Sequence, residues 1–333
     1  MRMCPRASQH SSSFITVTRP HRSRRVADVV ANAASHATSP TPSTHKTSFS
    51  HGITYTSYEI NTFTIKFNAT GVRVLVDPWL VGDLTFAEQD WLYRGKKRVI
   101  GRTLRVDVSQ VASETDVLVL TQSLDDHAHL PTLRVFPKSV PVVANPSAAA
   151  IARSLGFTDV RVVDHGQSIT VCEGRLKITA TVGALVGPPW SKRQNGLVFQ
   201  EVVPPATSPT GEVFRGSSVY FEPHCDFDAQ SVGRVGKVDV VISPIVTALL
   251  GVGAAAYPLT QGDMNLLQLL KLLQPQVLVP LLNSEMEHEG PLRVLIQERG
   301  DYEGVRQQLV KAGLGSVRLE FPAPPGESMA IAL

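Results

Sequence analysis

Short apolar stretches follow one another along the chain from residue 51 onwards. Residues 53–60, 62–67 and 72–76 are rich in β-branched and aromatic side chains, and turn residues separate them. This pattern predicts a meander of antiparallel strands. The next segment, residues 79–110, has no regular periodicity, so we expect it to be irregular.

From residue 116 onwards, the pattern predicts a helix as well as strands. Residues 116–120 and 140–144 are continuous apolar runs, which are typical of buried strands. Residues 146–156 predict a helix that ends at a glycine, and 160–163 predict the strand that follows it. This passage is therefore expected to be a β-α-β unit.

The second half of the chain also mixes strands and helices. Residues 168–182 predict a hairpin, and the later expected elements are strands at 196–203, 217–222, 238–243 and 276–281, helices at 262–273 and near 302–312, and two short C-terminal strands. Two mixed halves favour an α+β sandwich of two mixed β-sheets with outer helices over one doubly wound parallel sheet.

The first fifty residues differ in composition from the rest. They contain seven Lys and Arg residues, one acid (Asp28) and abundant Ser and Thr, which is typical of an organelle transit peptide rather than of a merely disordered tail. Without them the formal charge changes from +3 to about −3, so the basic balance does not indicate nucleic-acid binding. We predict a disordered transit peptide over 1–50 and one domain over 51–333.

One uncharged stretch, residues 240–257, raises the question of a membrane span. A spanning helix needs about 20 predominantly apolar residues, and Pro244, Gly251 and Gly253 interrupt this stretch. We expect a buried strand that runs into an apolar loop, in a soluble protein without a transmembrane segment.

Two segments at expected strand ends carry the candidate chemistry. The stretch "TQSLDDHAHL" (121–130) places Asp126, His127 and His129 after a strand, and "EPH" places Glu222 and His224 after another. Histidine and carboxylate side chains bind metal ions, and a carboxylate beside a histidine also makes an acid–base pair. The alternative for the first segment is a polar loop that caps a helix, and the alternative for the second is a surface turn.

These segments and their order resemble the metallo-β-lactamase fold superfamily over about residues 52–332. The resemblance implies a four-layer αβ/βα sandwich. It rests on the opening strands, the strand-ending Asp-Pro, the loop 121–130, "YFEPH" and "QVLVPL". Together, "DPWLVGDLTF", "DDHAH", "EPH" and "LQPQVLVP" are similar to a divergent cyanobacterial and plastid branch, which implies a chloroplast location.

The family's metal loop, His-x-His-x-Asp-His, is degenerate in this chain. If its last two residues are Asp126 and His127, then Gln122 and Leu124 stand where the first two histidines belong. Leucine cannot bind a metal and glutamine is a poor zinc ligand. We therefore expect no two-zinc site, and at most one divalent ion (zinc, manganese or iron) held by Asp126, His127 and some of His129, Glu222 and His224.

The leading hypothesis from sequence is an atypical metal-dependent hydrolase of an ester, amide or phosphoester, with Asp126 and His127 as catalytic residues. The alternatives are a non-catalytic protein that binds an apolar or pigment-like ligand in the same pocket, and metal-free acid–base hydrolysis. The expected partner is a small molecule; the oligomeric state stays open. Asp77 is expected to support the loop by hydrogen bonds, and Trp79, Trp190 and residues 249–256 are candidates for an apolar entrance or for ordinary packing.

Overall fold

The computed structural model describes residues 51–86, 89–204, 215–253, 256–300 and 302–333. The chain divides into two units, Met1–Thr47 and Ser48–Leu333. The predicted transit peptide, residues 1–50, lies outside the described residues.

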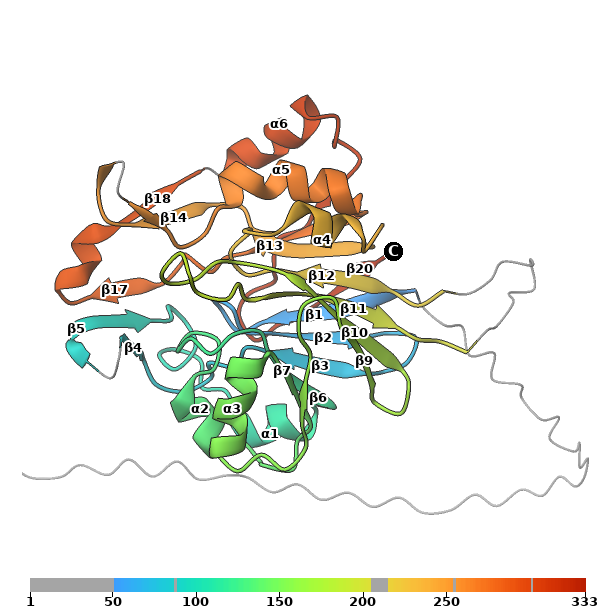
Figure 1. The fold of residues 1–333 in the computed structure, drawn as a ribbon, viewed down its shortest axis with the longest axis horizontal. Helices are drawn as coiled ribbons and strands as arrows, with labels where there is room; N and C mark the ends of the chain where they lie inside the picture. The colour runs from blue at the N-terminus through green and yellow to red at the C-terminus, as the bar shows by residue number, and fades with distance from the viewer. Residues whose placement is uncertain (1–50, 87–88, 205–214, 254–255, 301) are drawn as a thin grey trace, which may run out of the picture. The chain divides into compact units, whose positions relative to one another are not determined.

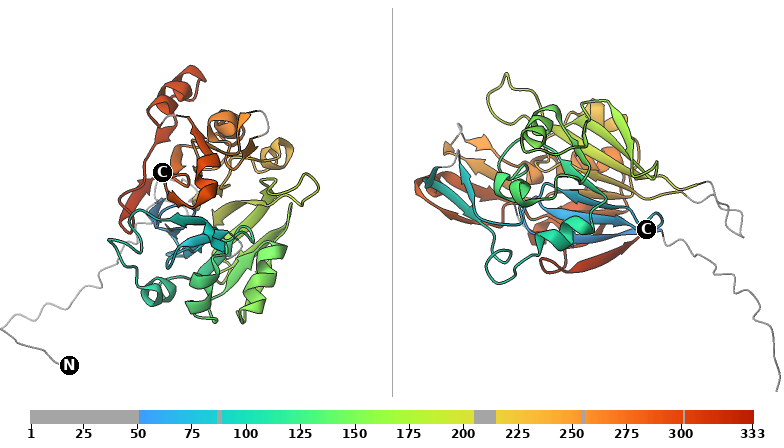
Figure 2. Two further views of the ribbon diagram at one scale, coloured as in Figure 1. Left: turned by 90° about the vertical axis from the view of Figure 1, so that its left-hand side faces the viewer. Right: turned by 90° about the horizontal axis from the view of Figure 1, so that it is seen from below.

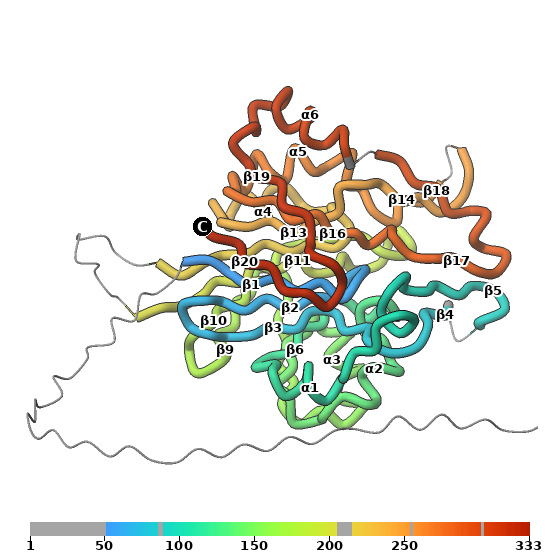
Figure 3. The backbone as a smooth tube through the Cα atoms, turned by 180° about the vertical axis from the view of Figure 1, so that it is seen from behind, coloured from blue at the N-terminus to red at the C-terminus, as the bar shows by residue number. Residues whose placement is uncertain are grey.

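The first of two seven-stranded sheets has the order β20-β1-β2-β3-β6-β7-β8 (Figure 1). It begins with the predicted antiparallel meander and continues with parallel strands. Figure 3 shows β20, close to the C-terminus, beside β1 at one edge. The strands are β1 (Gly52–Ser57), β2 (Phe63–Phe67), β3 (Arg73–Val76), β6 (Val117–Leu120), β7 (Val142–Ala144), β8 (Val160–Val162) and β20 (Ser328–Ala332).

The second seven-stranded sheet has the order β19-β16-β13-β12-β11-β10-β9. Its strands β9 to β12 pair antiparallel, whereas β12, β13, β16 and β19 pair in parallel. The strands are β9 (Ser168–Val171), β10 (Leu176–Val182), β11 (Asn195–Glu201), β12 (Ser218–Phe221), β13 (Val240–Pro244), β16 (Val277–Leu281) and β19 (Arg318–Leu319).

Helices cover the outer face of each sheet, which makes four layers. One apolar core lies between the sheets and contains residues from both; a second joins the first sheet to α1–α3, and a third joins the second sheet to α4–α6. The helices are α1 (Val108–Ser113), α2 (Leu130–Val135), α3 (Pro146–Ser154), α4 (Ala229–Gly233), α5 (Gly262–Leu273) and α6 (Tyr302–Lys311). The predicted sandwich of two mixed sheets with outer helices is confirmed.

Helix α5 illustrates how the sequence determines these layers. Its buried leucines recur three or four positions apart and therefore share one face: Leu266, Leu269, Leu270 and Leu273. They pack in the third core, against the second sheet. The helix is capped at Gln274 in the left-handed conformation (φ 44°), a common way to close a helix. The helix predicted over 262–273 is confirmed.

Two three-stranded sheets correct the sequence prediction. Residues 79–110, expected to be irregular, contain β4 (Leu84–Phe86), β5 (Gln89–Lys96) and the start of helix α1, and β5 pairs with β17 (Glu287–Glu289). The expected apolar loop after β13 contains β14 (Thr247–Leu250) and β15 (Tyr257–Pro258), and β14 also pairs with β18 (Ile296–Arg299). Both small sheets lie at the same end of the sandwich (Figures 1 and 2).

No helix within the described residues is long and apolar enough to cross a membrane. Residues 240–253, the described part of the uncharged stretch up to its first gap, form the buried strand β13 and then β14. Their hydrophobicity is therefore explained by burial in the sheets.

Candidate functional site

The candidate residues gather at one end of the sandwich, where parallel strands stop. Asp77 follows β3 and loop 121–130 follows β6, and these strands pair in parallel. The turn 222–226 follows β12 and Asn283 follows β16. In sheets with parallel strands, ligands bind outside the carboxyl ends of the strands. The topology therefore brings the separate segments to one place.

His127 is fixed from one side by Asp77. Both side chains are fully buried, and His127 Nδ1 lies 2.7 Å from Asp77 Oδ2. Thr121 also donates to Asp77, from its backbone N (2.8 Å) and its hydroxyl (2.6 Å). Asp77 has left-handed backbone geometry (φ 44°), which costs energy for a residue other than glycine. The expected supporting role of Asp77 is thus present as direct contacts.

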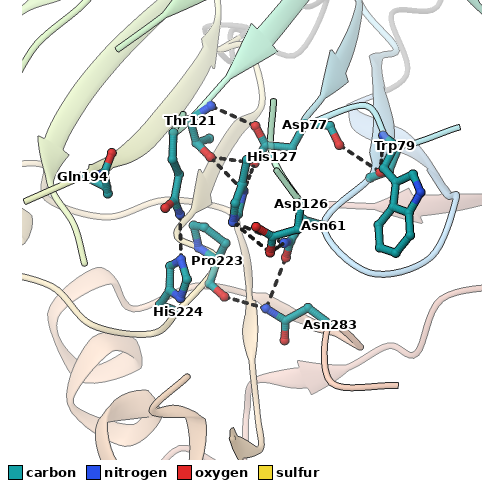
Figure 4. A network of polar contacts seen from close by, with 12 residues as sticks. Asn61, Asp77, Trp79, Thr121, Asp126, His127, Gln194, Pro223, His224 and Asn283 are labelled. Carbon is teal, nitrogen blue, oxygen red and sulfur yellow. Dashed lines mark hydrogen bonds and ion pairs between the residues drawn. The ribbon is translucent and has the colours of Figure 1, made fainter. Parts of the chain in front are cut away.

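The other ring nitrogen of His127 faces Asn61 and Asp126 (Figure 4). Asn61 Nδ2 lies 3.2 Å from His127 Nε2 and donates to Asp126 Oδ2 at 2.9 Å. Asn283 Nδ2 in turn donates to Asn61 Oδ1 (3.1 Å) and to the carbonyl of Pro223 (2.6 Å). If the His127 ring is neutral, its Nε2 accepts a hydrogen bond from the Asn61 amide. If the ring is charged, its Nε2–H points to the Asp126 carboxylate, 3.4 Å away. Nε2 faces protein groups in either form.

His224 is bound on both sides as well. Its Nδ1 donates to the carbonyl of Leu259 (2.5 Å), and its Nε2 accepts from the side-chain amide of Gln122 (2.6 Å). The rings of His127 and His224 are 5.6 Å apart between centroids. The Gln122 amide therefore occupies the lone pair with which His224 could bind a metal.

Glu222 organises the neighbouring turn. Its Oε2 accepts from the backbone N of His224 (3.1 Å) and of Asp226 (2.9 Å). The side chain is fully buried, and its Oε1 has no hydrogen-bond partner among the described residues. The carboxyl group therefore holds the backbone of the turn that carries His224.

His129 points away from the other candidates. Its Nδ1 contacts the Thr132 hydroxyl (3.0 Å) and its Nε2 lies 3.4 Å from the Asp83 carbonyl. The ring packs on Trp79, with centroids 5.5 Å apart. His129 precedes helix α2 and is buried beside this tryptophan, so the structure separates it from the cluster.

Charge and burial shift the pKa values of the site in different directions. Burial would lower the pKa of His127, but the carboxylates of Asp126 and Asp77 outweigh it and raise the pKa to about 8. Burial raises the pKa of Glu222 to about 8. For His224, burial and the nearby His127 lower the pKa to about 4, which agrees with a neutral ring that accepts from Gln122.

A cavity of about 510 Å³ opens directly onto this network. Asn61, Asp126, His224 and Asn283 line its inner end, and strands of the two small sheets supply part of the remaining wall. That wall is largely apolar and includes Leu84, Ala184, Leu185, Leu250, Leu259 and Ile296. Its volume lies within the range of small-molecule sites.

Tyr93 and His288 form a polar spot on the wall of the same cavity. Tyr93 Oη lies 2.8 Å from His288 Nδ1 and 3.5 Å from Met286 Sδ. Burial raises the pKa of the Tyr93 hydroxyl, and the charge of Asp126 raises it further. Asp126 is therefore close enough to influence this part of the wall.

The donor set does not fit the metal centre that the resemblance implies. Within the described residues, no three histidine, cysteine or acidic side chains are placed to share one ion. A histidine needs a free nitrogen lone pair to bind a metal, and both nitrogens of His127 and of His224 already contact protein groups. Of the five predicted ligands, the structure brings together Asp126, His127 and His224, assigns Glu222 to the turn and separates His129.

Sequence reasoning missed several residues of the site and placed two aromatic residues differently. Asn61 and Asn283 are central to the network, and strands of the small sheets supply part of the cavity wall. Trp190 is 86% exposed and Trp79 only 1%, and neither lines the cavity. Leu250, within the segment 249–256, does line it. The asparagines gave no signal because amides at turns are common.

The fold and the place of its loops define the class of the protein, an αβ/βα sandwich with its site at the strand ends. A family model described as "Beta-lactamase superfamily domain" matches residues 54–282, and the chain belongs to this family. The resemblance stated from the sequence is thereby confirmed for the superfamily. A comparison with curated proteins gives no match.

Solved structures share the fold at low sequence identity. An isothiocyanate hydrolase from Delia radicum gut bacteria is 21% identical (TM-score 0.57), with 84% of this chain and 100% of that chain covered. A possible metal-dependent hydrolase from Veillonella parvula is 16% identical (TM-score 0.57; 84% and 100% covered). A metallo hydrolase from the archaeon Ignicoccus hospitalis is 17% identical (TM-score 0.52; 84% and 99% covered).

Proposed function

We propose that this protein binds an apolar small molecule in the cavity, and that a hydrogen-bonded network replaces the resident metal centre of the family. The observation that carries the proposal is the position of the cavity, directly on Asn61, Asp126, His224 and Asn283. An enclosed apolar wall with a few polar groups at one end is the usual composition of a small-molecule site.

The network supports binding because its polar groups are already held in place. Asn283 fixes the amide of Asn61, which donates to Asp126, and Gln122 fixes His224. A preorganised site loses less conformational entropy on binding. Asp126, whose side chain is 27% exposed, is then the charged group that a ligand reaches.

The proposal is tested with naphthylethanol, an uncharged apolar probe, by fluorescence titration. Leu250 lines the cavity, so Leu250→Trp would fill part of it, and we expect binding at least about tenfold weaker than in the wild type, because a filled pocket excludes the ring. Val310→Trp is the control, since Val310 lies on α6 and is 66% exposed. No saturable binding to the wild type, or equal binding to both variants, would contradict the proposal.

A metal-dependent hydrolase is the second candidate. The supporting observations are membership of the superfamily and the proximity of Asp126, His127 and His224 at the strand ends. This function requires Gln122 and Asn61 to release the two histidines so that they can bind an ion. Metal content separates the two candidates, because only the hydrolase retains an ion that depends on His127.

A further inference from the structure

We infer that the cavity selects an apolar amine, with the ammonium group directed at Asp126. This inference rests on the proposed function and adds the chemical class of the ligand. It follows from the charges around the cavity, the free face of Asp126 and the aromatic side chains of the wall.

The cavity is acidic. Four carboxylates line it, namely Asp125, Asp126, Asp226 and Glu298, and none of the described lining residues is a lysine or an arginine. A cleft with charges of one sign and low-dielectric walls concentrates its potential and attracts the opposite charge. The lining therefore favours a cation and disfavours a carboxylate or phosphate.

Two arginines that contact acidic residues beside the cavity are already paired. Arg193 contacts Asp226 at 2.5 Å, which neutralises that carboxylate. Arg98 contacts Glu285 at 3.1 Å. His224 donates at Nδ1 and accepts at Nε2, so its hydrogen bonds require the neutral ring. None of these groups supplies a free positive charge that an anionic ligand would need.

Asp126 retains a binding face on the cavity side. Its Oδ2 accepts from Asn61 and lies 3.4 Å from His127. Its side chain is 27% exposed and lines the cavity. When His127 is protonated, it faces both Asp77 at 2.7 Å and Asp126 at 3.4 Å, so the two carboxylates together keep one net negative charge. The negative charge of Asp126 therefore remains available, and an ammonium group that donates to it makes a charge-assisted hydrogen bond.

The wall suits the remainder of such a ligand. Tyr93 and Tyr257 line the cavity together with its leucines, and tyrosine rings attract cations as well as packing against apolar groups. Asp126 and Tyr93 both line this cavity, so a ligand that fills it meets the carboxylate and the ring.

Three probes with the same ring test the inference: naphthylethylamine, naphthylethanol and naphthylacetate, titrated by fluorescence at neutral pH. We expect the amine to bind about tenfold more tightly than the alcohol, and the carboxylate to bind more weakly than both. Tighter binding of naphthylacetate, or equal binding of all three, would overturn the inference while leaving the proposed function intact. Binding of none of the three would contradict the proposed function itself.

Asp126→Asn identifies the group responsible. The amide retains an oxygen acceptor for Asn61 but loses the charge, so the preference for amine over alcohol should decrease to about twofold or less. Asp159→Asn is the control, since Asp159 is exposed, pairs with Arg161 and does not line the cavity. An unchanged amine preference in folded Asp126→Asn protein would show that Asp126 does not select the ligand. If this variant does not fold, the three-probe comparison on the wild type still decides the inference.

Discussion

At the residue scale, the site is defined by what already binds each histidine. The ring nitrogens of His127 face Asp77 on one side and Asn61 with Asp126 on the other. Those of His224 contact the Leu259 carbonyl and Gln122. Side-chain amides, from Asn61 and Gln122, thus contact both histidines.

Lys97 is the residue whose burial gives the most direct pH dependence. Its Nζ donates to the carbonyls of Tyr58 (2.6 Å) and Trp79 and lies 3.3 Å from the Thr62 hydroxyl, so it ties the chain just after β5 to the first sheet. Burial lowers the pKa of Lys97 to about 7 from 10.5, and the nearby Glu59 carboxylate offsets only part of this. The folded chain therefore releases a proton that the unfolded chain keeps.

We predict that stability rises with pH in the window set by these two pKa values. Between pH 7 and 9, the unfolded state binds more protons, so the free energy of unfolding of the wild type should increase by roughly 2 kcal/mol relative to Lys97→Met. Urea unfolding of both proteins across this range measures the difference. Parallel pH profiles for the wild type and Lys97→Met would show that this lysine does not titrate in the window.

At the element scale, strand β11 passes very close to the site. A Cβ at Gly196 would lie 2.6 Å from Thr181 Oγ1, 2.7 Å from Tyr220 Oη and 3.3 Å from Glu222 Cγ. Strands β10 and β12 flank β11 and supply two of these side chains. The absence of a side chain at this position therefore leaves room for the hydroxyls of Thr181 and Tyr220, and an added Cβ would also press on Glu222.

Gly196→Ala is accordingly expected to destabilise the fold by about 1–3 kcal/mol, the usual cost of overpacking a core. It should also weaken binding of naphthylethanol, because Glu222 holds the turn of His224. Gly315→Ala is the matched control, since a Cβ there meets Val310 at 3.5 Å, an ordinary contact. Equal melting temperatures for the two variants would refute this view of the packing.

The strands and helices also show which parts of the fold can be predicted from sequence patterns. Continuous apolar runs predicted β6, β7 and the parallel strands of the second sheet, and the spacing of leucines predicted α5. The small sheets were missed because β5 is largely exposed and lacks alternation, and because its partner β17 lies far along the chain. Pairing between distant polar segments leaves no local signal.

For the candidate site, the sequence indicated loops that the structure brings together, but it could not give their contacts. Asp126, His127 and His224 do meet, as the resemblance implied, because their strands are neighbours in the fold. The separation of His129 and the roles of Asn61 and Asn283 depend on hydrogen bonds between segments up to 222 positions apart. Such contacts are fixed by tertiary packing and are not readable from spacing.

At the scale of the whole molecule, the family architecture is retained while the chemistry at its strand ends differs. The sandwich brings four separate segments together, and the two small sheets enclose a cavity over them. Carboxylates and aromatic rings face that cavity. Under the proposed function, the same scaffold binds a small molecule through protein groups alone.

Metal retention tests this account most directly. The purified full chain is incubated with zinc, manganese or ferrous iron, desalted and assayed by elemental analysis beside His127→Ala. Because the histidine lone pairs are already engaged, we predict far less than about one equivalent of any metal in the wild type, and the same amount in the variant. About one equivalent retained by the wild type and lost in His127→Ala would contradict the account and favour the metal-dependent hydrolase.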